Sequence, residues 1–138
     1  MINLQRMRIL ISVECRIREK REYAFSRATK ITPTITGMPH GSKTHSQTES
    51  GAIDLAEIDD AYAEVYADLE AMRAELSALL PALDDPDDIA VIRYRYMMGI
   101  PLRAIPDLMC VSERAMFYHL STAEHKLVRM YPGQVALK

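Results

Sequence analysis

The residues of this chain best suited to chemistry lie near its C-terminal end, in the stretch CVSERAMFYHLSTAEHKL, residues 110–127. Arginine can donate two hydrogen bonds to guanine, and glutamate can accept one from cytosine, so Arg114 and Glu113 are suited to reading base edges. A Phe or Tyr can contact a thymine methyl group or a sugar. The side chains in this stretch that can form hydrogen bonds are Glu113, Arg114, Tyr118, Ser121, Thr122 and His125.

The same stretch has an apolar side. Met116, Leu120, Ala123 and Leu127 recur every three or four positions, which predicts one amphipathic helix beginning after Ser112. The polar residues then lie on the opposite face. That face either contacts a nucleic acid or is a solvated surface of a small helical bundle.

Other candidate chemistry in the sequence is weak. The DDPDD segment, residues 84–88, lacks the pattern of a calcium loop, and it fits the start of a helix with Asp85 as the cap and Pro86 in the first turn. His119 and His125 have no Cys or carboxylate partner at zinc-ligand spacing, and neither do His40 and His45. We therefore predict no catalytic residue, no metal site and no cofactor, and a protein that is not an enzyme.

Short helices precede the polar helix. Residues 86–98, which end before Gly99, and residues 102–109 have apolar residues at helical spacing. A turn through Cys110 and Val111 separates the second of them from the helix that follows Ser112. This order predicts a helix-turn-helix domain over residues 85–131, whose last helix can enter the major groove of DNA.

The N-terminal part of the chain predicts two longer helices. Residues 4–28 are basic, and residues 52–80 are acidic with an apolar seam at alternating steps of three and four. Opposite charges favour an antiparallel helical hairpin over residues 1–80, closed by a linker at 29–51 that is rich in Ser, Thr, Gly and Pro. The alternative is a homo-oligomer in which the seam of helix 52–80 pairs with a second copy.

Composition limits the class of protein. The chain has 138 residues, a formal net charge of −2, 49% hydrophobic residues and only five glycines, which indicates an all-α fold. Residues 91–138 are net basic, so a nucleic-acid ligand remains compatible with the overall charge. No stretch resembles a signal peptide or a membrane span. Cys15 and Cys110 form no CxxC pair, and we expect free thiols in small buried positions, in a reducing compartment.

Two stretches carry a resemblance to known proteins. GIPLRAIPDLMCVSERAMFYHLSTAEHKL resembles the helix-turn-helix of sigma-factor region four. Together with ATKITPTITGMPHGS upstream, it is similar to small phage and prophage proteins of Gram-positive bacteria related to the ArpU/RinA-type late-gene transcription regulators. In this motif Cys110 stands where Gly is preferred, and Pro106 where a small helix former is preferred.

The resemblance implies which residues contact double-stranded DNA. Ile105, Met109, Val111 and Met116 occupy the positions that pack the two helices together. The positions that face DNA are Ser112, Glu113, Arg114, Phe117, Tyr118 and Ser121. Arg93 and Arg95 in the RYRY segment, and Lys126 in the last helix, are the expected phosphate contacts.

The expected function is sequence-specific binding of double-stranded DNA by a phage or prophage transcription regulator in the cytoplasm of a bacterial host. One alternative is a small terminase subunit that recognises viral DNA for packaging. Another is an adaptor that docks on RNA polymerase without binding DNA.

Overall fold

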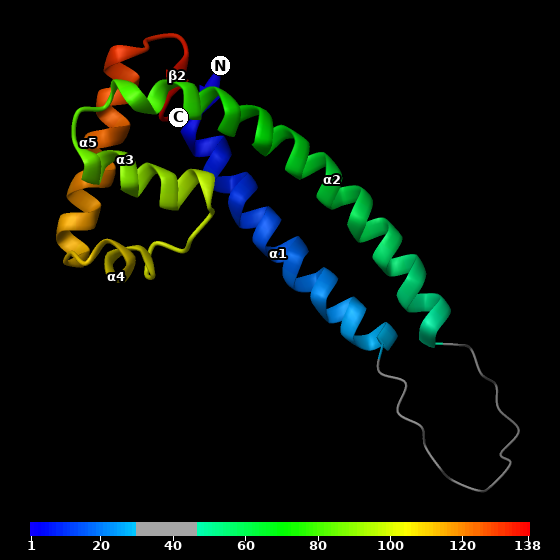
Figure 1. Ribbon diagram of the computed structural model, residues 1–138. Coiled ribbons are helices and arrows are strands. Elements are labelled where there is room, and N and C mark those ends of the chain that lie inside the picture. Colours follow the sequence, from blue (N-terminus) through cyan, green and yellow to red (C-terminus); the bar gives the residue numbers. More distant parts are fainter. Residues whose placement is uncertain (30–46) are drawn as a thin grey trace, which may run out of the picture. The chain divides into compact units, whose positions relative to one another are not determined.

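The computed structural model describes residues 1–29 and 47–138, and among these it describes no side chain for residue 28 or residues 47–55. The predicted linker lies mostly outside this range. The chain forms two compact units, a larger one of residues Met1–Ser12 with Ala67–Lys138 and a smaller one of residues Val13–Tyr66. Helices dominate both units, which confirms the all-α prediction (Figure 1).

Two long helices each contribute to both units. Helix α1 spans Leu4–Thr29 and α2 spans Gln47–Leu79, so α2 begins earlier than the predicted residue 52. Within the larger unit, Arg6 pairs with Asp68 at 3.1 Å, and the N-terminal amine lies 3.8 Å from Glu75. Within the smaller unit, Arg21 pairs with Asp59 at 2.8 Å. In each unit an ion pair therefore joins a basic side chain of α1 to an acidic side chain of α2.

The core of the larger unit explains why the first residues of the chain belong to it. Leu4 and Met7 of α1 are fully buried, and so are Leu69 and Leu76 of α2. They join one cluster with the buried residues of the C-terminal helices. The unit thus extends beyond the predicted helix-turn-helix domain of residues 85–131, because apolar side chains from both long helices complete its core.

The C-terminal region contains the short helices. α3 spans Pro86–Ile92 and continues as a π-helical turn, η2, over Arg93–Met97. Asp85 caps α3 by accepting a hydrogen bond from the backbone N–H of Asp87, as predicted from DDPDD. Gly99, with φ of +66°, ends this segment at the predicted place. A 3-10 turn, η1 (Leu80–Ala82), lies between α2 and α3. From there on, the helices follow one another in the order that the sequence pattern predicts.

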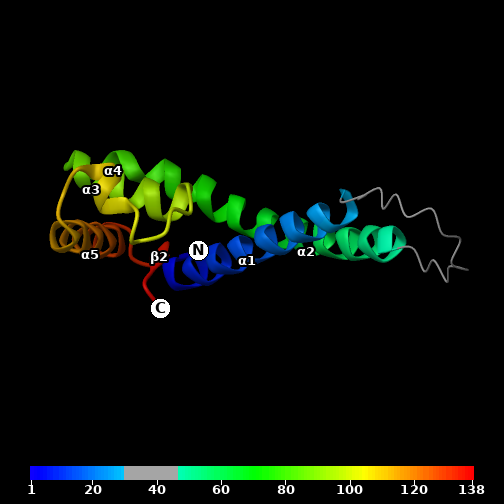
Figure 2. The same cartoon turned by 90° about the horizontal axis from the view of Figure 1, so that it is seen from below.

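The last two helices of the chain lie where the sequence predicts a helix-turn-helix. α4 spans only Ile105–Met109, shorter than the predicted 102–109, and begins where Pro106 can occupy its first turn. α5 spans Glu113–Met130 and packs against α3 and α4 (Figure 1). A short parallel pair of strands, which the sequence did not reveal, joins β1 (Ile2–Asn3) to β2 (Val135–Ala136), and Figure 2 shows β2 beside the N-terminus.

Candidate nucleic-acid interface

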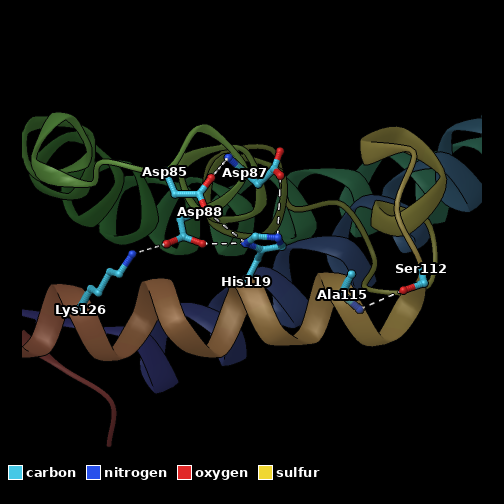
Figure 3. A network of polar contacts seen from close by, with 7 residues as sticks. All are labelled: Asp85, Asp87, Asp88, Ser112, Ala115, His119 and Lys126. Carbon is cyan, nitrogen blue, oxygen red and sulfur yellow. Dashed lines mark hydrogen bonds and ion pairs between the residues drawn. The ribbon is translucent and has the colours of Figure 1, made fainter.

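Helix α5 is fixed at its start and along one face. Ser112 has an extended backbone, and its hydroxyl oxygen accepts a hydrogen bond at 3.1 Å from the backbone N–H of Ala115 (Figure 3). This N-cap satisfies one of the free N–H groups of the first turn. The predicted apolar face of Met116, Leu120, Ala123 and Leu127 is buried to at least 94% at every position. Because this side of α5 is buried, the opposite side of the helix faces away from the core.

The turn before α5 has the geometry of a Schellman motif. Cys110 adopts a left-handed conformation with φ of +54°, and its N–H donates to the carbonyl of Asp107 while Val111 N–H donates to Pro106. Glycine is the residue that adopts this conformation without a steric cost. The motif prefers Gly at position 110, and the left-handed backbone of Cys110 is the physical reason for that preference. Both Cys110 and Cys15 are free thiols but exposed, so the prediction of buried positions was wrong.

Cys110→Gly is expected to stabilise the protein by about 1 kcal/mol, because the left-handed conformation costs a side-chain-bearing residue about that much. Urea unfolding followed by circular dichroism measures the change. Cys110→Ala is the matched control, since alanine removes the thiol and keeps the Cβ atom. Equal stability of the Gly and Ala variants would show that the turn is not strained.

The structure brings the predicted base-facing residues to one exposed surface. All six are exposed, with Tyr118 at 68% and Phe117 at 44%. Arg114 has no hydrogen-bond or ion-pair partner among the described residues, so its guanidinium is available to a ligand. We refer to these residues as the α5 face: Ser112, Glu113, Arg114, Phe117, Tyr118 and Ser121.

The three predicted phosphate contacts lie in different environments. Arg93 is exposed and has no partner in the part of the chain that the structure describes. Arg95 is half-buried, and with Phe117 and Ser121 it lines a hollow of about 250 Å³ beside the α5 face. Its Nε is buried without a hydrogen-bond partner among described residues, and burial, with the nearby charge of Arg8, lowers the pKa of Arg95. Lys126 instead pairs with Asp88 at 2.8 Å, and this hydrogen bond raises the pKa of Lys126.

A buried network that the sequence did not reveal lies behind the same hollow. Glu124 is only 5% exposed, and its Oε1 accepts hydrogen bonds from the hydroxyl of Tyr96 and the guanidinium of Arg8. Burial, followed by the charge of Glu124, raises the pKa of the Tyr96 hydroxyl well above its usual range. Burial alone would lower the pKa of Arg8, but its hydrogen bond to Glu124 and the neighbouring Tyr96 raise it. The network links α1, η2 and α5 within the larger unit.

A second network connects α5 to the start of α3 (Figure 3). Asp88, 1% exposed, lies 2.9 Å from His119 Nδ1 and 2.8 Å from Lys126 Nζ, so both side chains of α5 reach the same carboxylate. His119 is half-buried. Sequence spacing did not indicate its carboxylate neighbours, which approach only because α3 packs on α5.

The same region contains donor atoms that metals use. One ligand atom each from Asp85, Asp87 and His119 lie within 4.8 Å of one another. Their present contacts account for the cluster, because Asp85 caps α3 and the His119 ring bonds Asp88. A cation there would also meet the positive end of α3 and the nearby ammonium group of Lys126. We assign these residues to positioning α5.

Comparison with protein-family models, curated proteins and solved structures finds no match to this chain. The similarity to sigma-factor region four and to the ArpU/RinA-type regulators therefore stays a prediction from the sequence. Within the described residues, the helices are too short or too polar to cross a membrane.

Proposed function

We propose that this protein is a sequence-specific, double-stranded-DNA-binding transcription regulator of phage or prophage origin that acts in the bacterial cytoplasm. The observation that carries the proposal is the α5 face, an exposed set of base-reading side chains on a helix whose opposite side is buried. The tight α4–α5 turn supports it, since a capped helix after such a turn is how a helix-turn-helix presents its reading helix.

The dimensions and chemistry of α5 fit a major groove. Its 18 residues give a rod about 27 Å long, and the major groove of B-DNA accepts an α-helix. The exposed residues cluster in the first turns, where reading helices contact base edges. Arg114 offers a bidentate donor for guanine, Glu113 an acceptor for cytosine, and Phe117 an apolar contact for thymine.

Arginine side chains beside α5 supply the electrostatic part of binding. Arg93 has no partner among the described residues and can contact a phosphate, and Arg95 lies at the edge of the α5 face. In this proposal the terminal nitrogens of Arg95 contact a phosphate, because its Nε is buried. Lys126 can contribute positive charge to DNA only while also holding Asp88, so its substitution would disturb folding as well as binding.

Base and phosphate contacts respond differently to mutation, which gives the test. Arg114→Ala and Tyr118→Ala are expected to cost about 1–3 kcal/mol on the preferred duplex, and much less on scrambled DNA. Arg93→Ala should weaken binding to every sequence and lower the slope of log affinity against log salt by about one unit. Fluorescence anisotropy at several salt concentrations measures both, on a site first selected from random duplexes.

Arg129→Ala is the matched control for this test, since Arg129 is an exposed arginine at the far end of the same helix. It should leave the preference for the selected site unchanged. If Arg114→Ala and Tyr118→Ala keep both the fold and the ratio of specific to non-specific affinity, α5 does not read bases.

A protein adaptor that docks on RNA polymerase is the second candidate. Exposed apolar side chains beside the turn favour it, because Leu108 is 50% exposed and Phe117 and Tyr118 lie on the neighbouring surface. Such patches are typical of protein contacts. Absence of salt-dependent affinity for any duplex, together with polymerase binding that Leu108→Ser abolishes, would support this candidate over DNA recognition.

A further inference from the structure

The smaller unit leaves its helix seam partly uncovered. Ile58, Tyr62 and Val65 continue the α2 seam, but each is only half-buried, whereas Leu69 and Leu76 in the larger unit are fully buried. Large aromatic side chains of α1 add to the exposed apolar surface, with Tyr23 exposed at 66% and Phe25 at 61%. In a pair of helices, each apolar seam is covered by one neighbouring helix only. The rest of the seam in this unit is therefore apolar surface available to a further partner.

One groove of the smaller unit combines this apolar surface with charge. It has a volume of about 630 Å³ and lies between α1 and α2. Tyr23 and Ala24 of α1 and Ile58 of α2 form its apolar part. Its remaining lining residues are charged: Arg16, Glu19, Lys20, Arg27 and Glu57.

Most of these charges belong to one row on each helix, and Glu19 of α1 also lines the groove, one position before Lys20. On α1, Arg16, Lys20, Tyr23 and Arg27 follow the spacing i, i+4, i+7, i+11, which places them on one side of the helix; we call them the basic row. On α2, Glu57, Ala61 and Glu64 follow the same spacing and form the acidic row. All seven are exposed.

Most of these charges have no ion-pair partner among the residues that the structure describes. Among described residues, Arg16, Lys20, Glu57 and Glu64 make no ion pair, in contrast to Arg21 and Asp59, which pair at 2.8 Å elsewhere on the same two helices. Arg27 lies over the Tyr23 ring at 5.9 Å. The two rows therefore present unpaired charges of opposite sign on one unit.

We propose that the groove is the interface of a symmetric dimer, in which the basic row of each copy packs against the acidic row of the other. A two-fold axis forms the basic–acidic contact twice, once for each copy, so one surface that carries both signs is complementary to itself. Tyr23 is the apolar anchor, and the small side chain of Ala61 leaves room for it on the opposite helix. The interface lies outside the α5 face and does not depend on DNA binding.

A second copy fits the groove better than other partners do. The acidic row would repel a nucleic acid or an anionic membrane that the basic row attracts, and an unrelated protein would need both rows at matching spacing. The part of the α2 seam from Leu69 to Leu76 is already buried in the chain's own core. A homo-oligomer built on helix α2 would therefore use the smaller unit rather than that part of the seam.

Charge reversal gives a selective test in the full-length chain. Arg16→Glu with Lys20→Glu gives both rows a net negative charge, and Glu57→Lys with Glu64→Lys gives both rows a net positive charge. Each variant alone should dimerise at least about tenfold more weakly than wild type, because like charges then face each other. Mixing the two should restore a dimer of near wild-type affinity. Sedimentation equilibrium at low salt measures the affinities, and circular dichroism verifies that each variant is folded.

Two further variants keep the test falsifiable. Tyr23→Ala removes the anchor without altering charge and should also weaken the dimer at least about tenfold, since large aromatic residues dominate interface energies. Glu113→Lys with Arg129→Glu reverses charges on α5 and should leave dimerisation unchanged. A monomeric wild type, an unaffected reversed variant or a mixture that stays monomeric would each overturn the proposal. DNA affinity of the α5 variants is a separate measurement, so the two proposals can fail independently.

Discussion

Leu69→Asp is expected to unfold the larger unit at room temperature. Leu69 is fully buried in the core that joins α1, α2 and the C-terminal helices. A basic residue one turn further along α2, Arg73, already donates hydrogen bonds to Glu70 and to the carbonyl of Tyr96. Burying an unpaired charge costs several kcal/mol, which is a large part of the 5–15 kcal/mol that typically stabilises a domain. Circular dichroism should show loss of the cooperative thermal transition.

Two control variants separate the effect of the buried charge from the loss of side-chain volume and from the change in helix propensity. Leu69→Ala leaves a cavity and should cost about 2–5 kcal/mol while the chain still folds. Ala71→Asp places the same carboxylate at an exposed position of α2 and should change stability by less than about 1 kcal/mol. A Leu69→Asp protein with wild-type unfolding would show that α2 is not part of this core.

Local patterns in the sequence predicted much of the C-terminal region. The Ser112 cap, the apolar stripe of α5 and the Asp85–Pro86 helix start depend on neighbours within a few residues, and the structure contains all three. Such features follow from backbone hydrogen bonding and helical periodicity, which act over one or two turns. The exposure of the α5 face then followed from the burial of its opposite side.

Long-range contacts were not predictable in the same way. The β1–β2 pair joins the two ends of the chain, and Glu124 reaches Arg8 across 116 positions. No spacing rule relates residues so far apart, and a glutamate on a helix is normally solvated. The sequence predicts a phosphate contact for Lys126 because no spacing rule relates it to Asp88, its partner in another helix.

The ends of some helices also differ from the predicted ones, at places where tertiary contacts determine them. The segment after Ile92 continues as a π-helical turn, and the carbonyl of Tyr96 accepts a hydrogen bond at 2.8 Å from the buried guanidinium of Arg73. Arg73 was the one basic residue in the acidic region of residues 51–90, and periodicity alone gave it no role. The α4 helix begins late because Pro106 is tolerated only in a first turn.

Glu124→Ala is expected to destabilise the protein by about 3 kcal/mol, although Glu124 is a charged residue on a surface helix. The change removes the acceptor of two hydrogen bonds. The hydroxyl of the fully buried Tyr96 then keeps, among the described residues, only the hydrogen bond that it accepts from Arg8. The change also leaves Arg8, whose side chain is 33% exposed, without its counter-charge. Breaking one partner of a buried ion pair typically costs about 3–5 kcal/mol, and partial solvation of Arg8 places the value at the lower end.

Urea unfolding of a small set of variants tests whether this energy belongs to the network. Glu124→Gln keeps an acceptor for Tyr96 but loses the charge, so its stability should fall between Ala and wild type. Glu113→Ala, on the exposed face of the same helix, should change stability by less than about 0.5 kcal/mol. In a double-mutant cycle, Arg8→Ala should cost less in the Glu124→Ala background than in wild type, because the two side chains stabilise each other. Additive effects of Arg8→Ala and Glu124→Ala would mean that α1 and α5 are held together by apolar packing alone.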